Sequence, residues 1–147
     1  MPANTIAIAS DHAGFQLKSM LREELAELGF TVVDLGTNDT QSVDYPDFAY
    51  AMSAALREGR AKKGVLICGS GIGISMAANR DPNIRAALIH DAFGARMARQ
   101  HNDANVICFG DRMIGADVAR DCLRIFLETE FEGGRHARRV DKLSKPA

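Results

Sequence analysis

Short apolar runs alternate with longer amphipathic segments along the whole chain. Five of the runs are bounded by Gly, Asp or Asn and are short, as is typical of buried β-strands. These runs are Thr5–Ala9, Thr31–Asp34, Gly64–Cys68, Ile84–Leu88 and Asn105–Phe109. In the segments between them, apolar residues recur every three to four positions, which predicts helices with one buried face.

The first predicted helix shows this spacing most fully. Its apolar face consists of Leu17, Met20, Leu21, Leu25 and Leu28. Its charged residues, among them Lys18 and Arg22, are expected to turn away from the core. Two later helices have the corresponding faces Phe48, Met52, Ala55, Leu56 and Ala119, Cys122, Leu123, Phe126. Gly29 and Gly59 are expected to end helices, whereas Gly94 weakens the prediction of a helix around it.

Alternating strands and helices predict an α/β fold, because right-handed βαβ units build a parallel sheet covered on both faces. We expect a Rossmann-like three-layer sandwich with a five-stranded parallel sheet and a C-terminal helical tail. Residues 1–147 are expected to form one domain, with residues 132–147 as a charged arm on this domain or on a partner subunit. In such sheets ligands bind beyond the carboxyl ends of the strands. The loops to inspect are therefore Ser10–Gly14, Gly69–Gly73 and Gly110–Gly115.

Composition narrows the choice of partners. The chain has 18 basic and 19 acidic residues and a net charge of −1, which argues against a dedicated nucleic-acid binder. Its longest uncharged stretch, Gly64 to Asn79, is too short to span a bilayer, so no membrane partner is expected. The first residues carry no basic region of a secretory signal, and we expect a cytoplasmic protein. A small anionic ligand stays compatible with this balance, because it needs only a local cationic pocket.

The glycine-rich loop Gly69–Gly73 is the most informative segment. It joins an apolar strand to a helix, and a helix N-terminus with close backbone approach favours an anion such as a phosphate or a developing oxyanion. A Walker A loop would need a Lys followed by Ser or Thr, and no such pair follows Gly73. A dinucleotide fingerprint would need a glycine at Ile74. The alternative is a tight turn that needs glycine only for its geometry.

Cys68 lies at the end of the strand that enters this loop. A thiolate beside backbone N–H groups is stabilised, and Ser70 is close enough in sequence to hydrogen-bond the thiol or a substrate. Spacing alone leaves Cys68 open as a nucleophile or as a general base. Cys108 and Cys122 are expected to be small buried apolar residues. Three widely spaced cysteines form neither a disulfide framework nor a zinc motif.

The histidines are ambiguous. His12 follows Asp11 in the first ligand-side loop, whereas His101 precedes the last strand, at the wrong edge of the sheet for a site in its own subunit. His101 could still reach the pocket of a neighbouring subunit. His90 and Asp91 suggest a helix-capping pair, and Asp11, His12, His90 and Asp91 lack compact metal-ligand spacing, so no metal site is expected.

Arginines gather near the end of the chain. Arg135, Arg138 and Arg139 follow helical spacing, so that Arg135 and one of the other two could hold a phosphate from one helix face. From spacing alone, a solvated basic tail is the favoured interpretation.

Seven blocks in order carry a resemblance to type-B ribose-5-phosphate isomerases, from Ile6 to about Val140. The blocks are SDHAGFQLK (Ser10–Lys18), DLGT (Asp34–Thr37), DYPDFA (Asp44–Ala49), CGSGIGISMAANR (Cys68–Arg80), ARQHNDANV (Ala98–Val106), FGDRMIG (Phe109–Gly115) and FEGGRHARRV (Phe131–Val140). The resemblance implies a cofactor-independent aldose–ketose isomerase for a sugar phosphate.

Roles for individual residues follow from the resemblance. Cys68 resembles the base that moves a proton between C1 and C2, and Ser70 the hydroxyl residue that supports it. His101 resembles the residue that opens the sugar ring. The other residues it assigns contact the substrate or bind its phosphate: Asp11, His12, Gly69, Gly71, Ile72, Gly73, Asn102, Arg112, Arg135 and Arg139. Family sites lie between two subunits, which implies a homodimer or a dimer of dimers.

Some relatives of this type use a glutamate in the glycine-loop helix as the base. Here that helix reads ISMAAN and has no acid, which leaves Cys68 without a rival. Other functions stay open: a hexose 6-phosphate isomerase of the same family acting on galactose or allose 6-phosphate, a non-catalytic phosphate-binding module, or a cysteine hydrolase or amidotransferase. The last would need a histidine paired with Cys68.

Overall fold

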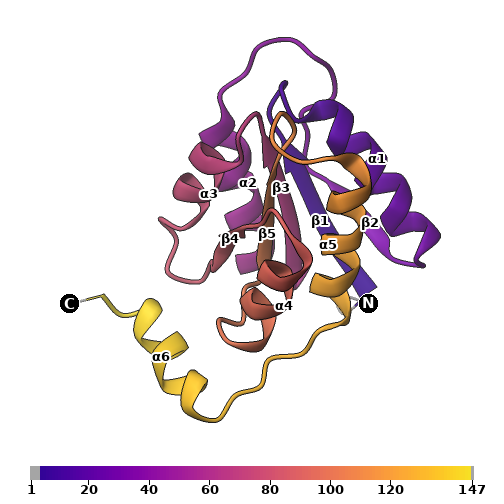
Figure 1. Cartoon of the computed structure of the whole chain (residues 1–147). Coiled ribbons are helices and arrows are strands. Elements are labelled where there is room, and N and C mark those ends of the chain that lie inside the picture. The colour runs from indigo at the N-terminus through magenta and orange to yellow at the C-terminus, as the bar shows by residue number, and fades with distance from the viewer. Residues whose placement is uncertain (1–3, 147) are drawn as a thin grey trace.

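The computed structural model describes residues 4–146 and confirms the predicted α/β sandwich (Figure 1). Its strands are β1 (Thr5–Ser10), β2 (Thr31–Asp34), β3 (Lys63–Cys68), β4 (Ala86–Leu88) and β5 (Val106–Gly110). Its helices are α1 (Phe15–Glu27), α2 (Tyr45–Arg57), α3 (Ile72–Ala78), α4 (Ala92–Gln100), α5 (Ala116–Glu128) and α6 (Arg135–Leu143). Parts of two expectations, the missing secretory signal and the arm over residues 132–147, fall on residues 1–3 and 147, outside the described residues.

The strands form one parallel sheet in the order β2-β1-β3-β5-β4. The chain runs outward from β1 to β2 and then crosses to β3 on the other side of β1. A crevice therefore opens between the carboxyl ends of β1 and β3, where open α/β sheets bind ligands. The expectation of five buried strands is wrong for β2 and β4, which are only partly buried because each is an edge strand with one neighbour.

Helices cover both faces of the sheet. On one face α1, α4 and α5 bury a cluster that includes Leu21, Phe109 and Phe126. On the other face α2 and α3 pack through Met52 and Ile74. The predicted apolar face of α5 is confirmed, since all four of its residues, Ala119, Cys122, Leu123 and Phe126, are buried.

Helix α1 departs from its prediction at two residues. Lys18, expected to turn away from the core, is fully buried and its ammonium lies 2.7 Å from the Asp34 carboxylate. The ion pair explains the burial, because a lysine enters a core only with a partner for its charge. Leu28, expected on the buried face, is 40% exposed, since α1 has already ended at Glu27.

Two local predictions around α4 are also resolved. Asp91 is the N-cap, and its carboxylate accepts a hydrogen bond from the Gly94 N–H at 2.6 Å, which confirms the expected capping role. Gly94 thus lies inside a helix, which the sequence had made doubtful. Ile84, predicted to begin a strand, precedes β4.

Helix α6 follows a long connection and lies beside the sandwich, near the end of the sheet where the strands begin (Figure 1). Its buried residue is His136, and its basic side chains are exposed. Within residues 4–146, no helix combines the length and the apolar character needed to cross a membrane.

Candidate active site

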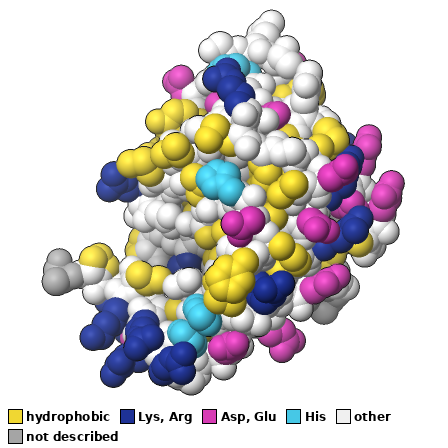
Figure 2. All heavy atoms as spheres, in the orientation of Figure 1, with side chains coloured by type: hydrophobic (Ala, Val, Ile, Leu, Met, Phe, Trp, Pro, Cys, Tyr) yellow, Lys and Arg dark blue, Asp and Glu magenta, His cyan; other side chains and the backbone are white. Residues whose placement is uncertain are grey.

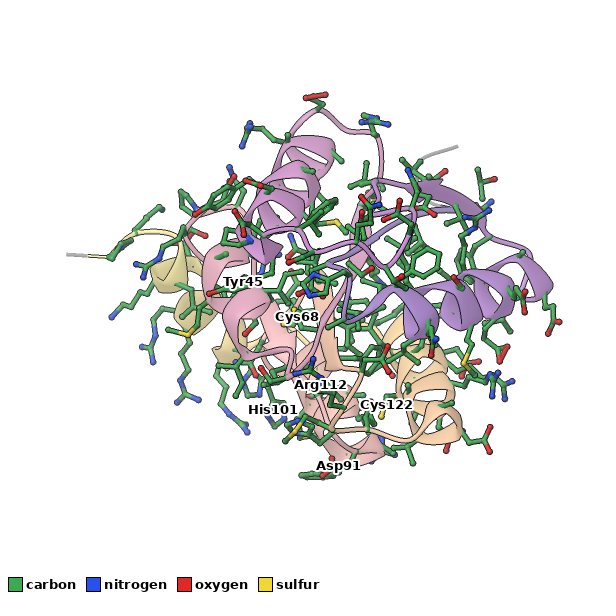
Figure 3. The ribbon with its side chains drawn as sticks, turned by 90° about the horizontal axis from the view of Figure 1, so that it is seen from above. Tyr45, Cys68, Asp91, His101, Arg112 and Cys122 are labelled. Carbon is green, nitrogen blue, oxygen red and sulfur yellow. The ribbon has the colours of Figure 1, made fainter. Side chains whose placement is uncertain are left out.

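A cleft of about 730 Å3 opens at the carboxyl ends of β1, β3 and β5. The three loops that the sequence singled out all contribute to it. Its walls are formed by Asp11, His12, Ala13, Tyr45, Cys68, Gly69, Ser70, Ile72, Gly73, Met76, Arg112 and Met113. Figure 3 shows Tyr45, Cys68 and Arg112 from above, on the side of the molecule where this cleft opens.

Cys68 is the last residue of β3 and is 4% exposed. The backbone N–H of Gly71 donates a hydrogen bond to its Sγ at 3.2 Å. Gly71 can do this because it adopts a φ of 76°, which turns its amide back toward the strand. The start of the glycine loop therefore directs a backbone N–H at the Cys68 sulfur.

The loop is packed tightly against β5. A Cβ at Gly110 would lie 2.5 Å from the Ser70 backbone, so glycine is required for the close approach of the two loops. The Ser70 hydroxyl accepts the N–H of Ile72 at 3.2 Å. Helix α3 begins at Ile72, and its first amides lack carbonyl partners within the helix. The loop and the first residues of α3 form the floor of the cleft, and anion binding there stays a prediction.

Asp11 and His12 enter the cleft from the end of β1. One Asp11 carboxylate oxygen accepts the Gly14 N–H at 3.0 Å, which ties the loop to the start of α1. His12 Nδ1 accepts the backbone N–H of Val43 at 3.1 Å. In a neutral imidazole the other nitrogen, Nε2, must then carry the hydrogen, so His12 can donate to a hydroxyl or a phosphate.

Arg112 supplies positive charge from the loop after β5. Its backbone N–H donates to the Gly69 carbonyl at 3.0 Å, and its guanidinium would lie 3.4 Å from a Cβ at Gly69. The neighbouring Asp111 points elsewhere, since its carboxylate accepts the N–H of Leu17 in α1 at 3.2 Å. The Arg112 charge therefore stays available for an anion above the glycine loop.

Tyr45 lines the cleft, although nothing in the sequence assigned it to the site. It is the first residue of α2, and its ring lies against Gly73, where a Cβ would approach within 2.6 Å of the ring. The DYPDFA block contained the residue, but nothing in its spacing connected α2 with the glycine loop. Only the packing of α2 beside α3 does so.

Five residues that the resemblance assigns to the site do not line this cleft. Gly71 is buried within the glycine loop, whereas His101, Asn102, Arg135 and Arg139 belong to other parts of the chain. His101 ends α4, at the edge of the sheet where β5 begins. Asn102 borders a different cavity of about 340 Å3, together with Leu143 of α6. The two arginines lie on α6, over which Lys and Arg side chains gather on the surface (Figure 2). One chain thus separates the assigned residues into two groups.

His101, Glu132 and His136 form a second cluster, with ligand atoms all within 4.8 Å of one another. Among residues 4–146, these are the His, Cys, Asp or Glu side chains that lie close enough together to hold a metal ion. They are not the residues Asp11, His12, His90 and Asp91 that were considered from the sequence. The two imidazole rings are stacked, with centroids 4.2 Å apart and planes 11° from parallel. A metal ion binds in the plane of an imidazole, so two stacked rings do not ligate one ion in this arrangement.

The other cysteines behave as expected of buried apolar residues. Burial raises the pKa of the Cys108 thiol, and the neighbouring Cys68 adds to the effect. Burial, with Asp91 and Asp121 nearby, raises the pKa of Cys122 to about 11. Both therefore remain protonated thiols at neutral pH. Neither lines the cleft, whereas Cys68 does.

The chain is similar in sequence and in fold to several known proteins. A sequence model of the Ribose/Galactose Isomerase family matches residues 6–143. Escherichia coli ribose-5-phosphate isomerase B is 41% identical over 139 residues, covering 95% of this chain and 93% of that protein. Pectobacterium atrosepticum D-erythrulose-4-phosphate isomerase is 40% identical over 140 residues, covering 95% and 92%. The solved structure of Clostridium thermocellum ribose-5-phosphate isomerase B superimposes with a TM-score of 0.94 at 46% identity, covering 96% and 95%.

Proposed function

The chain belongs to the ribose/galactose isomerase family, and we propose that this isomerase interconverts ribose 5-phosphate and ribulose 5-phosphate. The observation that carries the proposal is the position of Cys68. Its sulfur receives an N–H at 3.2 Å and lies in a cleft with Arg112 and His12, where a sugar phosphate finds both a base and positive charge.

The reaction moves one proton between neighbouring carbons. Cys68 as thiolate takes the proton from C2 of the open-chain aldose, and the carbonyl oxygen at C1 becomes an enediolate oxygen. The C2 hydroxyl then gives up its proton to form the ketone, the C1 oxygen takes up a proton, and the thiol returns a proton to C1. The backbone amides of the Gly69–Gly73 loop that are not already bonded to Cys68 or Ser70 are suited to stabilise the negative charge. Asp11 and Ser70 are suited to hold the sugar hydroxyls. These residues supply a base and an oxyanion site, and we propose that no metal or cofactor takes part.

Ring opening and part of the phosphate site are assigned to a partner subunit. His101, Asn102, Arg135 and Arg139 lie outside the Cys68 cleft of their own chain, so we propose a homodimer, or a dimer of dimers, in which they complete the cleft of the partner. Cys68 and His101 can act on the same substrate only if His101 comes from the partner subunit, because His101 does not line the Cys68 cleft of its own chain. Sugar phosphates are metabolites of the cytoplasm, so the expectation of a cytoplasmic enzyme is kept as part of the proposal.

A second candidate function is isomerisation of a sugar phosphate with a carbon chain shorter or longer than that of ribose 5-phosphate. The Pectobacterium relative is named for a four-carbon substrate at 40% identity, nearly the identity of the E. coli relative. The cleft of about 730 Å3 is open enough to admit either chain length and the expected hexose phosphates. Initial rates on ribose 5-phosphate, erythrose 4-phosphate, allose 6-phosphate and galactose 6-phosphate decide between them; a preference for any but the first would replace the proposed substrate.

The base assignment is tested with Cys68→Ala. We expect conversion of ribose 5-phosphate to fall by about 10²- to 10⁴-fold, while the Kd for the substrate changes little, because the thiolate acts on the proton and contributes little to binding. Cys122→Ala, which removes a buried thiol far from the cleft, is the matched control and should keep its activity.

The same assay separates the rival functions. Unchanged conversion by Cys68→Ala would refute the base. A wild-type protein that binds the sugar phosphate without converting it would identify a binding module instead. Activity that disappears with a chelator would contradict the metal-free reaction.

A further inference from the structure

His101 and His136 form a stacked pair that no step of the proposed reaction explains. Their ring centroids lie 4.2 Å apart and their planes are nearly parallel. His101 is the partly exposed member, with a side chain 39% exposed. His136 is buried, and its Nε2 has no hydrogen-bond partner within residues 4–146. The stack therefore places a buried ring directly against the His101 imidazole.

Backbone contacts bring the two rings together. The Glu132 N–H donates to the Gln100 carbonyl at 3.1 Å, so the connection to α6 is attached at the end of α4, one residue before His101. Arg99 reinforces this attachment by donating from Nε to the Thr129 carbonyl at 3.0 Å. Helix α6 then begins at Arg135, and His136 is its buried residue. The stack is thus held from both sides by the main chain.

The charges around the pair favour an uncharged His136. Burial lowers the pKa of His136, and His101, Arg135 and Arg139 lower it further, against an opposing effect of Glu132. The Glu132 carboxylate lies 3.9 Å from the Nε2 of His136 and 4.0 Å from that of His101. A neutral ring stacks favourably on either a neutral or a protonated imidazole, whereas two protonated rings would repel each other.

We propose that His136 is a positioning residue for ring opening: its ring, stacked on His101, holds the His101 imidazole at the angle at which it exchanges a proton with the cyclic sugar. This inference rests on the proposed function. Ring opening breaks the bond between C1 and the ring oxygen, the ring oxygen takes a proton and the C1 hydroxyl gives one up, so no net proton is consumed. A group that passes protons in both directions must keep its orientation through the step.

Initial rates measured in the two directions of the reaction distinguish a positioning role of His136 from a purely structural role. Ribose 5-phosphate is mostly a closed ring, whereas ribulose 5-phosphate has no ring to open, because its phosphate occupies the hydroxyl that would close a five-membered ring. For His136→Ala we expect the initial rate from ribose 5-phosphate to fall by about 10- to 100-fold. The initial rate from ribulose 5-phosphate should stay within about 3-fold of wild type.

His136→Phe tests the stack itself, because it keeps a flat uncharged ring and removes both nitrogens. It should restore conversion of ribose 5-phosphate to within about 3-fold of wild type. Lys142→Ala, an exposed change on the same helix, is the control and should leave both rates unchanged.

Equal losses in both directions for His136→Ala, no loss at all, or failure of His136→Phe to restore activity would each overturn the positioning role. Cys68→Ala should lose both directions, and a wild-type protein that converts neither sugar would overturn the proposed function itself.

Discussion

At the scale of single residues, Lys18 shows how a charge can become part of the core. Its ammonium pairs with Asp34 at 2.7 Å, and Asp34 also accepts the Gly36 N–H at 2.9 Å and the Arg22 guanidinium at 2.7 Å. Burial alone would raise the pKa of Asp34, but these hydrogen bonds and charges outweigh it and hold the pKa below its usual 3.8. The pair thereby fastens α1 to the end of β2, next to the loops of the cleft.

Lys18→Met should therefore destabilise the fold by about 3 kcal/mol at pH 7, because it leaves the Asp34 carboxylate partly buried without its main partner. A lowered folded-state pKa means that the contribution of Asp34 is complete above about pH 4 and is lost as the pH falls through the folded value. The difference between wild type and variant in urea unfolding should shrink accordingly below pH 4. Arg22→Met, which removes the exposed partner, should cost less than about 1 kcal/mol. A difference independent of pH between 3 and 7 would refute this account.

At the scale of secondary-structure elements, the joint between β3 and α3 determines the floor of the site. Gly71 and Gly59 share a φ of 76°, but their surroundings differ. A Cβ at Gly71 would lie 2.8 Å from the Phe109 backbone, whereas nothing lies within 4 Å of one at Gly59. The two glycines therefore separate the cost of left-handed backbone from the cost of close packing.

Gly59→Ala should lower the free energy of unfolding by about 1 kcal/mol and leave activity intact. Gly71→Ala should cost roughly 1–3 kcal/mol more, because β5 must move to admit the methyl group. It should also reduce isomerisation, since the displaced amide no longer reaches the Cys68 sulfur. Urea unfolding and initial rates measure the two effects; equal stability losses in both variants would contradict the packing argument.

At the scale of the whole molecule, the assigned residues fall into two groups at opposite edges of the sheet. Cys68 lies in the cleft at the carboxyl ends of the strands, whereas His101 lies where α4 returns to β5. A closed two-fold dimer is the simplest assembly in which the Cys68 cleft of each subunit meets the His101 group of the other, so that two complete sites form.

Mixed dimers test this arrangement. With ribose 5-phosphate as substrate, Cys68→Ala and His101→Ala should each be nearly inactive alone. Unfolded and refolded together in equal amounts, they should recover about a quarter of wild-type activity, because half of the dimers are mixed and each mixed dimer has one intact site. No recovery despite exchange of subunits would show that Cys68 and His101 act within one chain.

The sequence by itself determined the fold class and the floor of the site. Alternating apolar runs and amphipathic segments are local signals, and they located all five strands and the Gly69–Gly73 loop. Residues at the ends of β1, β3 and β5 could be grouped because parallel strands bring their carboxyl ends together. The blocks of resemblance added roles for His101 and the α6 arginines that spacing alone did not favour.

Only the tertiary structure decided contacts between elements that are distant in sequence. Lys18 was expected at the surface, because its place on the helix gave no sign of the Asp34 carboxylate that neutralises it. Tyr45 joined the cleft only through the packing of α2 against α3, and His136 met His101 only through the path of the connection to α6. Such contacts depend on how elements pack in three dimensions, and a periodic pattern carries information about one element at a time.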